Sequence, residues 1–179
     1  MSNTLNGKLI SDTILDDIKY QYSKYKEDKE CTLVVVTIGD DPASKVYVNN
    51  KKKACEYVGF DFYNKRFSTD TTFDEISSYM KELAFDISVY GVIVQLPIIS
   101  NVLNDYQKSI IPQLITPEKD VGGFGRNSLY TPGTPKGIIR MLDTIGYKYE
   151  GKIALVIGRS DIVGKPIAKL LLDKDCTVI

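Results

Sequence analysis

The chain has 179 residues, of which 43% are hydrophobic and 26% are charged, as in ordinary globular proteins. Lysine and arginine total 23, as do aspartate and glutamate, and this balance argues against a nucleic-acid or membrane-surface binder. No apolar stretch reaches the length of a membrane span, and residues 1–6 lack the apolar core of a signal peptide. The sequence contains no histidine, which excludes His-based triads and zinc sites. Three widely spaced cysteines indicate buried free thiols, so we expect a cytoplasmic protein without a metal site.

The first half of the chain alternates predicted helices and strands. The helices are predicted from apolar residues at helical spacing and from capping residues. The strands are predicted from β-branched apolar runs. The predicted elements are a helix over 7–26, a strand over 32–38, a helix capped by Ser44 and ended by Gly59, a strand over 61–67, a helix with a capping box at Thr72 and Glu75, and a strand over 90–95.

The second half continues the same alternation after a loop rich in glycine and proline. Its predicted elements are a helix within 103–115, a loop over 116–133, a helix opened by Thr134 and Pro135, a strand over 152–157, a turn over 158–163, a helix over 164–173 and the beginning of a strand at 177–179. This order predicts an α/β protein with parallel sheets. We expect two domains, at 1–133 and 134–179, of which the second has too few strands to complete its sheet.

Lys51 has an unusual position on the helix predicted after Ser44. With Tyr47 set to zero and 100° steps, Lys51 falls at about 40°, within the apolar arc that includes Cys55 and Val58. One interpretation is a lysine that buries its stem and keeps its amine in water. The other is a partly desolvated amine with a lowered pKa, which can transfer protons and lies one turn from Tyr47.

Turn-forming or polar residues follow the predicted strands, where ligands of open parallel sheets bind. One such stretch is 39–44, after the first strand. Gln95 ends a later strand, and its amide suits holding a lysine or a substrate amide, although a solvated strand end is the simpler interpretation. A cis bond before Pro97 would create a sharp turn beside it.

The segment GRSDIVG (158–164) lies between a predicted strand and a predicted helix. Glycines at such a place let the backbone approach a phosphate at the helix N-terminus, although the spacing differs from G-x-G-x-x-G. Arg159 and Ser160 suit the 2′-phosphate of NADP, or equally a solvated turn. The candidate cofactor-binding residues are Gly158, Arg159, Ser160, Ile162, Val163 and Gly164.

Five segments together resemble one enzyme family. They are IGDDPASKVYVNNKKKACEYVGF (38–60), GVIVQLPI (91–98), PEKDVGGF (117–124), TPKGI (134–138) and GRSDIVGKP (158–166). In this order they are similar to segments of the bifunctional methylenetetrahydrofolate dehydrogenase/cyclohydrolases. Five matches in family order are far more specific than any one of them.

The resemblance implies a folate-side α/β domain joined to a Rossmann NAD(P)-binding domain, with the active site in the cleft. It implies oxidation of 5,10-methylenetetrahydrofolate with NADP, or possible use of NAD, and hydrolysis of the methenyl product to 10-formyltetrahydrofolate. It also implies a homodimer and no metal. Lys51 would transfer protons, Tyr47 would stack on the folate and Gln95 would hold Lys51. The further substrate-binding residues implied are Ser44, Leu96, Pro97 and Asp120.

The chain departs from the family pattern in four places. The motif K-D-V-D-G reads KDVGG at 119–123, so Gly122 replaces the carboxylate that anchors the pterin ring. The loop over 125–131 is short, Gly133 stands where the family often has cysteine, and the sequence ends at Ile179 within the Rossmann domain. Because of these departures, an alternative remains: a relative that binds folate or dimerises, but is non-catalytic or acts on an altered substrate. An amino-acid dehydrogenase of similar plan is a third, less supported hypothesis.

Overall fold

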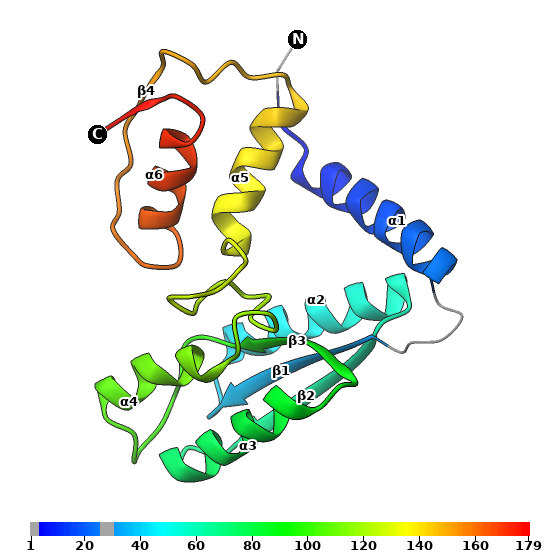
Figure 1. The fold of residues 1–179 in the computed structure, drawn as a ribbon, viewed down its shortest axis with the longest axis vertical. Coiled ribbons are helices and arrows are strands. Elements are labelled where there is room, and N and C mark those ends of the chain that lie inside the picture. Colours follow the sequence, from blue (N-terminus) through cyan, green and yellow to red (C-terminus); the bar gives the residue numbers. More distant parts are fainter. Residues whose placement is uncertain (1–3, 26–30) are drawn as a thin grey trace.

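The computed structural model describes residues 4–25 and 31–179 (Figure 1). Helices and strands alternate in it, which confirms the predicted α/β class. The elements in chain order are α1 (Gly7–Tyr25), β1 (Thr32–Ile38), α2 (Pro42–Val58), β2 (Asp61–Phe67), α3 (Phe73–Phe85), β3 (Val89–Val94), α4 (Asp105–Ile110), the 3-10 helix η1 (Ile111–Leu114), α5 (Gly133–Thr144), β4 (Ile153–Ala154), α6 (Gly164–Leu172) and β5 (Thr177–Val178). Within the described ranges, no helix is long and apolar enough to cross a membrane.

Strand β1 is the centre of a three-stranded parallel sheet with the order β2-β1-β3. Helix α2 lies on one face of this sheet and α3 on the other (Figure 1). Val35 and Val36 of β1 point to opposite faces and are both fully buried, because each face has a helix over it. The prediction of a strand covered on both sides is therefore confirmed.

Helix α3 supplies the apolar layer beneath the sheet. It begins with the predicted capping box, in which Thr72 Oγ1 accepts from Glu75 N and Glu75 Oε2 accepts from Thr72 N. Ile76, Met80 and Leu83 follow at helical spacing and are at most 5% exposed. Burying side chains of this size stabilises the fold by about 1.5–3 kcal/mol each.

The C-terminal part contains a second parallel pair, β4 and β5, with α5 and α6. Its core consists of Ile139 of α5, Tyr149, Ile167 of α6 and Cys176. Ala154 and Val156 pack against this core, whereas Ile153 and Ile157, on the alternate positions, are 72% and 93% exposed. One face of this two-stranded sheet is therefore covered by the helices, and the other face is exposed.

Helix α2 is capped by Asp41 and not by Ser44, which corrects the predicted cap. Asp41 Oδ2 accepts from Ser44 N at 2.7 Å, and Pro42 occupies the first helical position. Proline is tolerated there because its missing N–H would have no intrahelical partner. The predicted end is confirmed, since Gly59 adopts a left-handed conformation and its N–H donates to Cys55 O.

Two other boundaries differ from the sequence prediction. Helix α5 begins at Gly133, because Lys136 N donates to Pro132 O and closes a first turn earlier than Thr134. Strand β4 has two residues where six were predicted, because its partner β5 is equally short. The three cysteines are free; Cys55 and Cys176 are buried as expected, and Cys31 is only partly buried.

Candidate active site

The ends of β1 and β3 lie side by side, because the two strands are parallel neighbours. Gln95 comes directly after β3, is 9% exposed, and its N–H donates to Val36 O of β1. The Leu96–Pro97 peptide bond is cis, and it turns the chain away from the sheet at this point. The residues predicted at the strand ends thus occupy one edge of the sheet.

Lys51 reaches this edge from α2. Its Nζ donates to Gln95 Oε1 at 2.9 Å, and the Gln95 amide nitrogen donates to Leu96 O at 2.7 Å. The two bonds together fix which end of the amide faces Lys51. Burial lowers the pKa of Lys51, because taking an ammonium group out of water disfavours its charged form. The geometry therefore favours the interpretation of Lys51 as a partly desolvated amine over the interpretation in which its amine stays in water.

Tyr47 lies on the rim of the site, one turn before Lys51. Its side chain is 60% exposed, and its ring centroid is 5.9 Å from Lys51 Nζ. The buried arc of α2 contains Ser44, Val48, Cys55 and Val58, so it does not extend to Tyr47. An exposed aromatic ring beside a partly buried amine provides a flat surface on which a planar ligand could stack.

Ser44 and Leu96 hold the turn that carries Gln95. Ser44 is 7% exposed, and its Oγ donates to Leu96 O at 3.4 Å, the same carbonyl that accepts from the Gln95 amide. Pro97 is exposed at the surface of the turn. Ser44 and Leu96 therefore support the position of Gln95 in this structure, and Pro97 is the member of the turn that is open to a ligand.

Asp120 is 1% exposed and organises the loop that follows it. Its Oδ1 accepts from Gly123 N at 3.1 Å and its Oδ2 accepts from Gly125 N at 2.7 Å. Each oxygen can accept a further hydrogen bond, but the side chain is closed off from solvent. The predicted role of Asp120 as a direct substrate ligand would therefore require the loop to open.

Gly122 lies beside Asp120 at the position where the resemblance expects a second carboxylate. A Cβ built on Gly122 would meet its nearest neighbours, Asp120 Oδ1 and Ile93 Cγ2, at 3.5 and 3.7 Å. These are ordinary contact distances, and Gly122 has no positive φ. The backbone can therefore hold a larger residue, so the loss of the carboxylate is not forced by the fold.

The predicted cofactor segment forms the turn before α6. Gly158 has a φ of 147°, and a Cβ on Gly164 would lie 2.4 Å from Gly158 O. The backbones of the two glycines are therefore in direct contact, with no room for a side chain between them. Ser160 Oγ accepts from Val163 N and Gly164 N and so holds the turn that leads into α6. The side chain of Arg159 is exposed, whereas Ile162 and Val163 are partly buried.

The first turn of α6 faces the N-terminal unit. A cavity of about 880 Å³ is bordered by Asp161 and Lys165 on one side and by Arg126 and other residues of 123–128 on the other. Sequence reasoning gave neither Asp161 nor Lys165 a role. In the described ranges, no group of three cysteine or acidic residues could hold a metal ion.

Lys119 is another residue whose role the sequence analysis missed. Its Nζ donates to Leu83 O and to Asp86 O, both at 2.7 Å, at the C-terminal end of α3. A cation at a helix C-terminus is favoured by the helix dipole. The bonds tie the start of the 119–123 loop to α3, and no local spacing in the sequence indicates this contact.

Comparison with known families identifies the chain. Residues 5–122 match the tetrahydrofolate dehydrogenase/cyclohydrolase catalytic domain, and residues 132–179 match the NAD(P)-binding domain of the same enzymes. The chain belongs to the tetrahydrofolate dehydrogenase/cyclohydrolase family. The resemblance seen in the sequence and the predicted pair of domain types are therefore confirmed, while the boundary between 133 and 134 stays a prediction.

Relatives of this family match nearly the whole chain. The "Bifunctional protein FolD" of Agathobacter rectalis is 42% identical over 188 residues, which cover 99% of this chain and 66% of that protein. A solved methylenetetrahydrofolate dehydrogenase of the silkworm, Bombyx mori, is 31% identical with a TM-score of 0.91 and covers 100% of this chain and 67% of its own. The solved FolD enzyme of Campylobacter jejuni is 34% identical with a TM-score of 0.87, over 98% of this chain and 64% of its own.

Proposed function

We propose that this chain carries the folate-side chemistry of an NADP-dependent 5,10-methylenetetrahydrofolate dehydrogenase and methenyltetrahydrofolate cyclohydrolase. The observation that carries the proposal is the bond of 2.9 Å between Lys51 Nζ and Gln95 Oε1 at the edge of the sheet. It joins a partly desolvated amine, whose pKa is lowered, to a neutral acceptor, an arrangement that suits a proton-transfer group. Membership of the family and the likeness to enzymes named for both activities support it.

Lys51 acts as the proton-transfer group in this proposal. Gln95 keeps the amine oriented without adding a negative charge, so the lowered pKa of Lys51 is retained. Tyr47 stacks on the folate ring from the rim of the site, for which its exposed ring is suited. Pro97 contributes to the wall of the pocket, while Ser44 and Leu96 maintain the turn behind it.

The turn over 158–164 fits a dinucleotide phosphate. The close approach of Gly158 and Gly164 leaves no side chain between the loop and the N-terminus of α6, where anions are favoured. NADP bound there would accept the hydride in the dehydrogenase step. Arg159 is exposed and free of a carboxylate contact in the described part of the chain, so we assign it to the 2′-phosphate and favour NADP over NAD.

A second candidate function is a folate-binding or dimerising relative without catalysis. Gly122 favours it, because the pterin ring lacks its expected carboxylate and Asp120 is engaged by Gly123 and Gly125. The chain spans 66% of the length of the Agathobacter protein, so activities of whole relatives enter here as proposals. We also propose a cytoplasmic homodimer, in line with the free thiols and with the family resemblance.

The deciding experiment measures methenyltetrahydrofolate hydrolysis by this chain and by Lys51→Ala. Hydrolysis requires Lys51 and the folate pocket but no hydride acceptor. We expect a loss of rate of at least about a hundredfold in the variant, as for removal of a general acid or base. Tetrahydrofolate binding, measured on both folded proteins by calorimetry, separates the two candidates. Binding without hydrolysis in the parent chain supports the non-catalytic relative, and equal rates in parent and variant exclude Lys51 as the catalytic group.

A further inference from the structure

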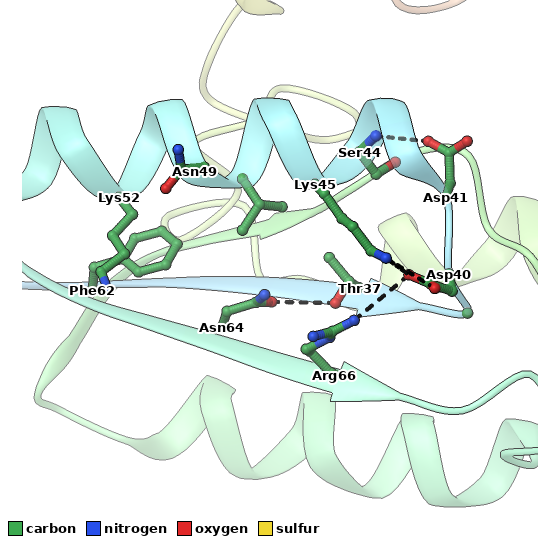
Figure 2. Close-up of a pocket in the computed structure, with 12 residues that line it drawn as sticks. Thr37, Asp40, Asp41, Ser44, Lys45, Asn49, Lys52, Phe62, Asn64 and Arg66 are labelled. Carbon is green, nitrogen blue, oxygen red and sulfur yellow. Dashed lines mark hydrogen bonds and ion pairs between the residues drawn. The ribbon is translucent and has the colours of Figure 1, made fainter.

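A groove lies between α2 and the strands β1 and β2, and Lys51 does not line it (Figure 2). It has a volume of about 400 Å³, within the range of small-molecule pockets. Lys45, Asn49 and Lys52 line it from α2, about 100–160° around the helix from Lys51. The floor comes from β1 and from the edge strand β2, whose alternate residues Phe62, Asn64 and Arg66 point into it. Ser44 also lines the groove and is the one lining residue with a role in the proposed folate site, where it supports the turn at Leu96.

Asn64 is held so that its donor end remains available. Thr37 is 9% exposed, and its Oγ1 shares one hydrogen between two acceptors, Asn64 Oδ1 at 3.2 Å and Lys65 O at 3.3 Å (Figure 2). The carbonyl end of the amide is therefore engaged with the floor of the groove, and the NH₂ end is left for a ligand. A fixed amide donor on the floor favours an acceptor, such as a carboxylate or phosphate oxygen.

The charges around the groove also favour an anion. Lys45, Lys52 and Arg66 supply three positive charges, and Asp40 and Asp41 supply two negative ones. Asp41 already accepts from Ser44 N and belongs to the helix cap. Lys52 pairs with Glu56 at 3.7 Å, so Asp40 is the carboxylate that faces the other two cations, Lys45 and Arg66.

Asp40 occupies the place that a ligand anion would take. Its Oδ1 is 2.8 Å from Lys45 Nζ and 3.6 Å from an Arg66 guanidinium nitrogen. The hydrogen bond from Lys45 lowers the pKa of Asp40, so this carboxylate is ionised at neutral pH. All three side chains are more than half exposed, and such pairs contribute little to stability. Another anion can therefore replace Asp40 at little cost.

We propose that this groove binds a small molecule with a doubly charged anionic group, a phosphate monoester or a dicarboxylate. The anion lies between Lys45 and Arg66 in place of the Asp40 carboxylate, with an oxygen toward the Asn64 amide. The planar guanidinium of Arg66 suits two oxygens of one such group. Phe62, at the opposite end of the groove in Figure 2, contacts the apolar part of the ligand. The site lies apart from Lys51, so it stands or fails independently of the proposed function.

The test is an NMR titration of the ¹⁵N-labelled chain with phenyl phosphate and with phthalate, and with inorganic phosphate as the probe without a ring. We expect saturable shifts at the amides of Asn64 and Arg66, and tighter binding of the two aromatic probes because of Phe62. Preference for phenyl phosphate or for phthalate identifies the phosphate or the carboxylate class. Absence of saturable shifts in the groove up to about 10 mM of every probe would overturn the proposal.

Matched variants separate this site from general charge effects. Arg66→Gln and Lys45→Gln should each weaken binding about tenfold, because a charged hydrogen-bond donor is lost. Lys53→Gln, on the exposed face of α2, should leave binding unchanged. Asp40→Asn removes the internal competitor and should tighten binding severalfold, whereas Asp74→Asn on α3 should not. Equal effects of the groove and control variants would show only non-specific attraction and would contradict the proposal.

Discussion

Lys51 Nζ donates to Gln95 Oε1 across 2.9 Å and so links the middle of α2 to the end of β3. The other end of the same amide donates to Leu96 O at 2.7 Å, which holds Gln95 in place. Gln95 brings no charge to Lys51, so nothing in this contact reverses the effect of burial on the pKa of Lys51. The neutral partner is therefore as important as the lysine for the proposed chemistry.

Replacing Gln95 by glutamate should raise the pKa of Lys51. A carboxylate at hydrogen-bond distance stabilises the ammonium form, which opposes the effect of desolvation. The pH dependence of acetylation at Lys51, followed by peptide mass spectrometry, should shift upward by about one pH unit or more. Gln95→Met, which has a similar size and no carboxylate, is the control. An unchanged or lower midpoint in the glutamate variant would show that the two residues do not interact as described.

The stability of the protein should depend on pH through Lys51. Burial lowers its folded pKa below the ordinary value of 10.5, so the unfolded chain binds the proton more tightly. The charged amine therefore opposes folding, and the free energy of unfolding should rise as the pH increases from the folded pKa toward 10.5. Lys51→Met should lack this rise, and Lys53→Met should retain it. Urea denaturation at several pH values measures the difference, and parallel curves for all three proteins would contradict it.

The helical period and the strand ends predicted the positions of Lys51 and Gln95, and the family resemblance implied that the two residues meet. Both signals are local, because the 3.6-residue period places Lys51 within the buried arc and an apolar run ends before Gln95. The parallel order of β1 and β3 then brings the two elements together. The cap of α2 was assigned wrongly although Asp41 followed by Pro42 is also a local signal, since proline at the first helical position marks the preceding residue as the cap.

The role of Asp120 could not be obtained from the sequence in this way. Its partners are the backbone N–H groups of Gly123 and Gly125, and their direction depends on how the loop turns. Every residue type except proline has a backbone N–H, so no spacing of side chains reports such a contact. The contact that Ser160 makes before α6 is of the same kind, because its hydroxyl accepts from Val163 N and Gly164 N.

Replacing Asp120 by asparagine should destabilise the protein by about 1–3 kcal/mol. The amide can accept only one of the two N–H groups, and its own NH₂ then faces a donor in a buried place. Urea denaturation gives the free energy, and amide hydrogen exchange should accelerate at Gly123 and Gly125. Asp105→Asn, at an exposed helix position, is the control. Wild-type exchange at both glycines would show that the carboxylate does not hold the loop.

Placing aspartate at position 122 should improve tetrahydrofolate binding. A Cβ there meets its neighbours at 3.5 Å or more, so the fold should tolerate Gly122→Asp with a change in stability below about 1 kcal/mol. A charged acceptor for the pterin ring should tighten binding about tenfold. Calorimetry measures the affinity. Gly123→Asp is the contrasting variant, because a φ of 69° and a Cβ 2.7 Å from Pro132 N should destabilise the loop. Unchanged affinity in a folded Gly122→Asp protein would place the pterin ring elsewhere.

Gly164→Ala should damage the turn before α6, although alanine favours helices. Its Cβ would lie 2.4 Å from Gly158 O and 2.7 Å from Arg159 N, so the backbone of the turn must move. We expect a loss of about 1–3 kcal/mol in the free energy of unfolding and weaker binding of NADP, both measured on the same protein. Gly137→Ala in α5 has no atom within 4 Å of its Cβ and should stabilise by about 0.5–1 kcal/mol. If the two alanine variants proved equally stable, the contact between Gly158 and Gly164 would not constrain this turn.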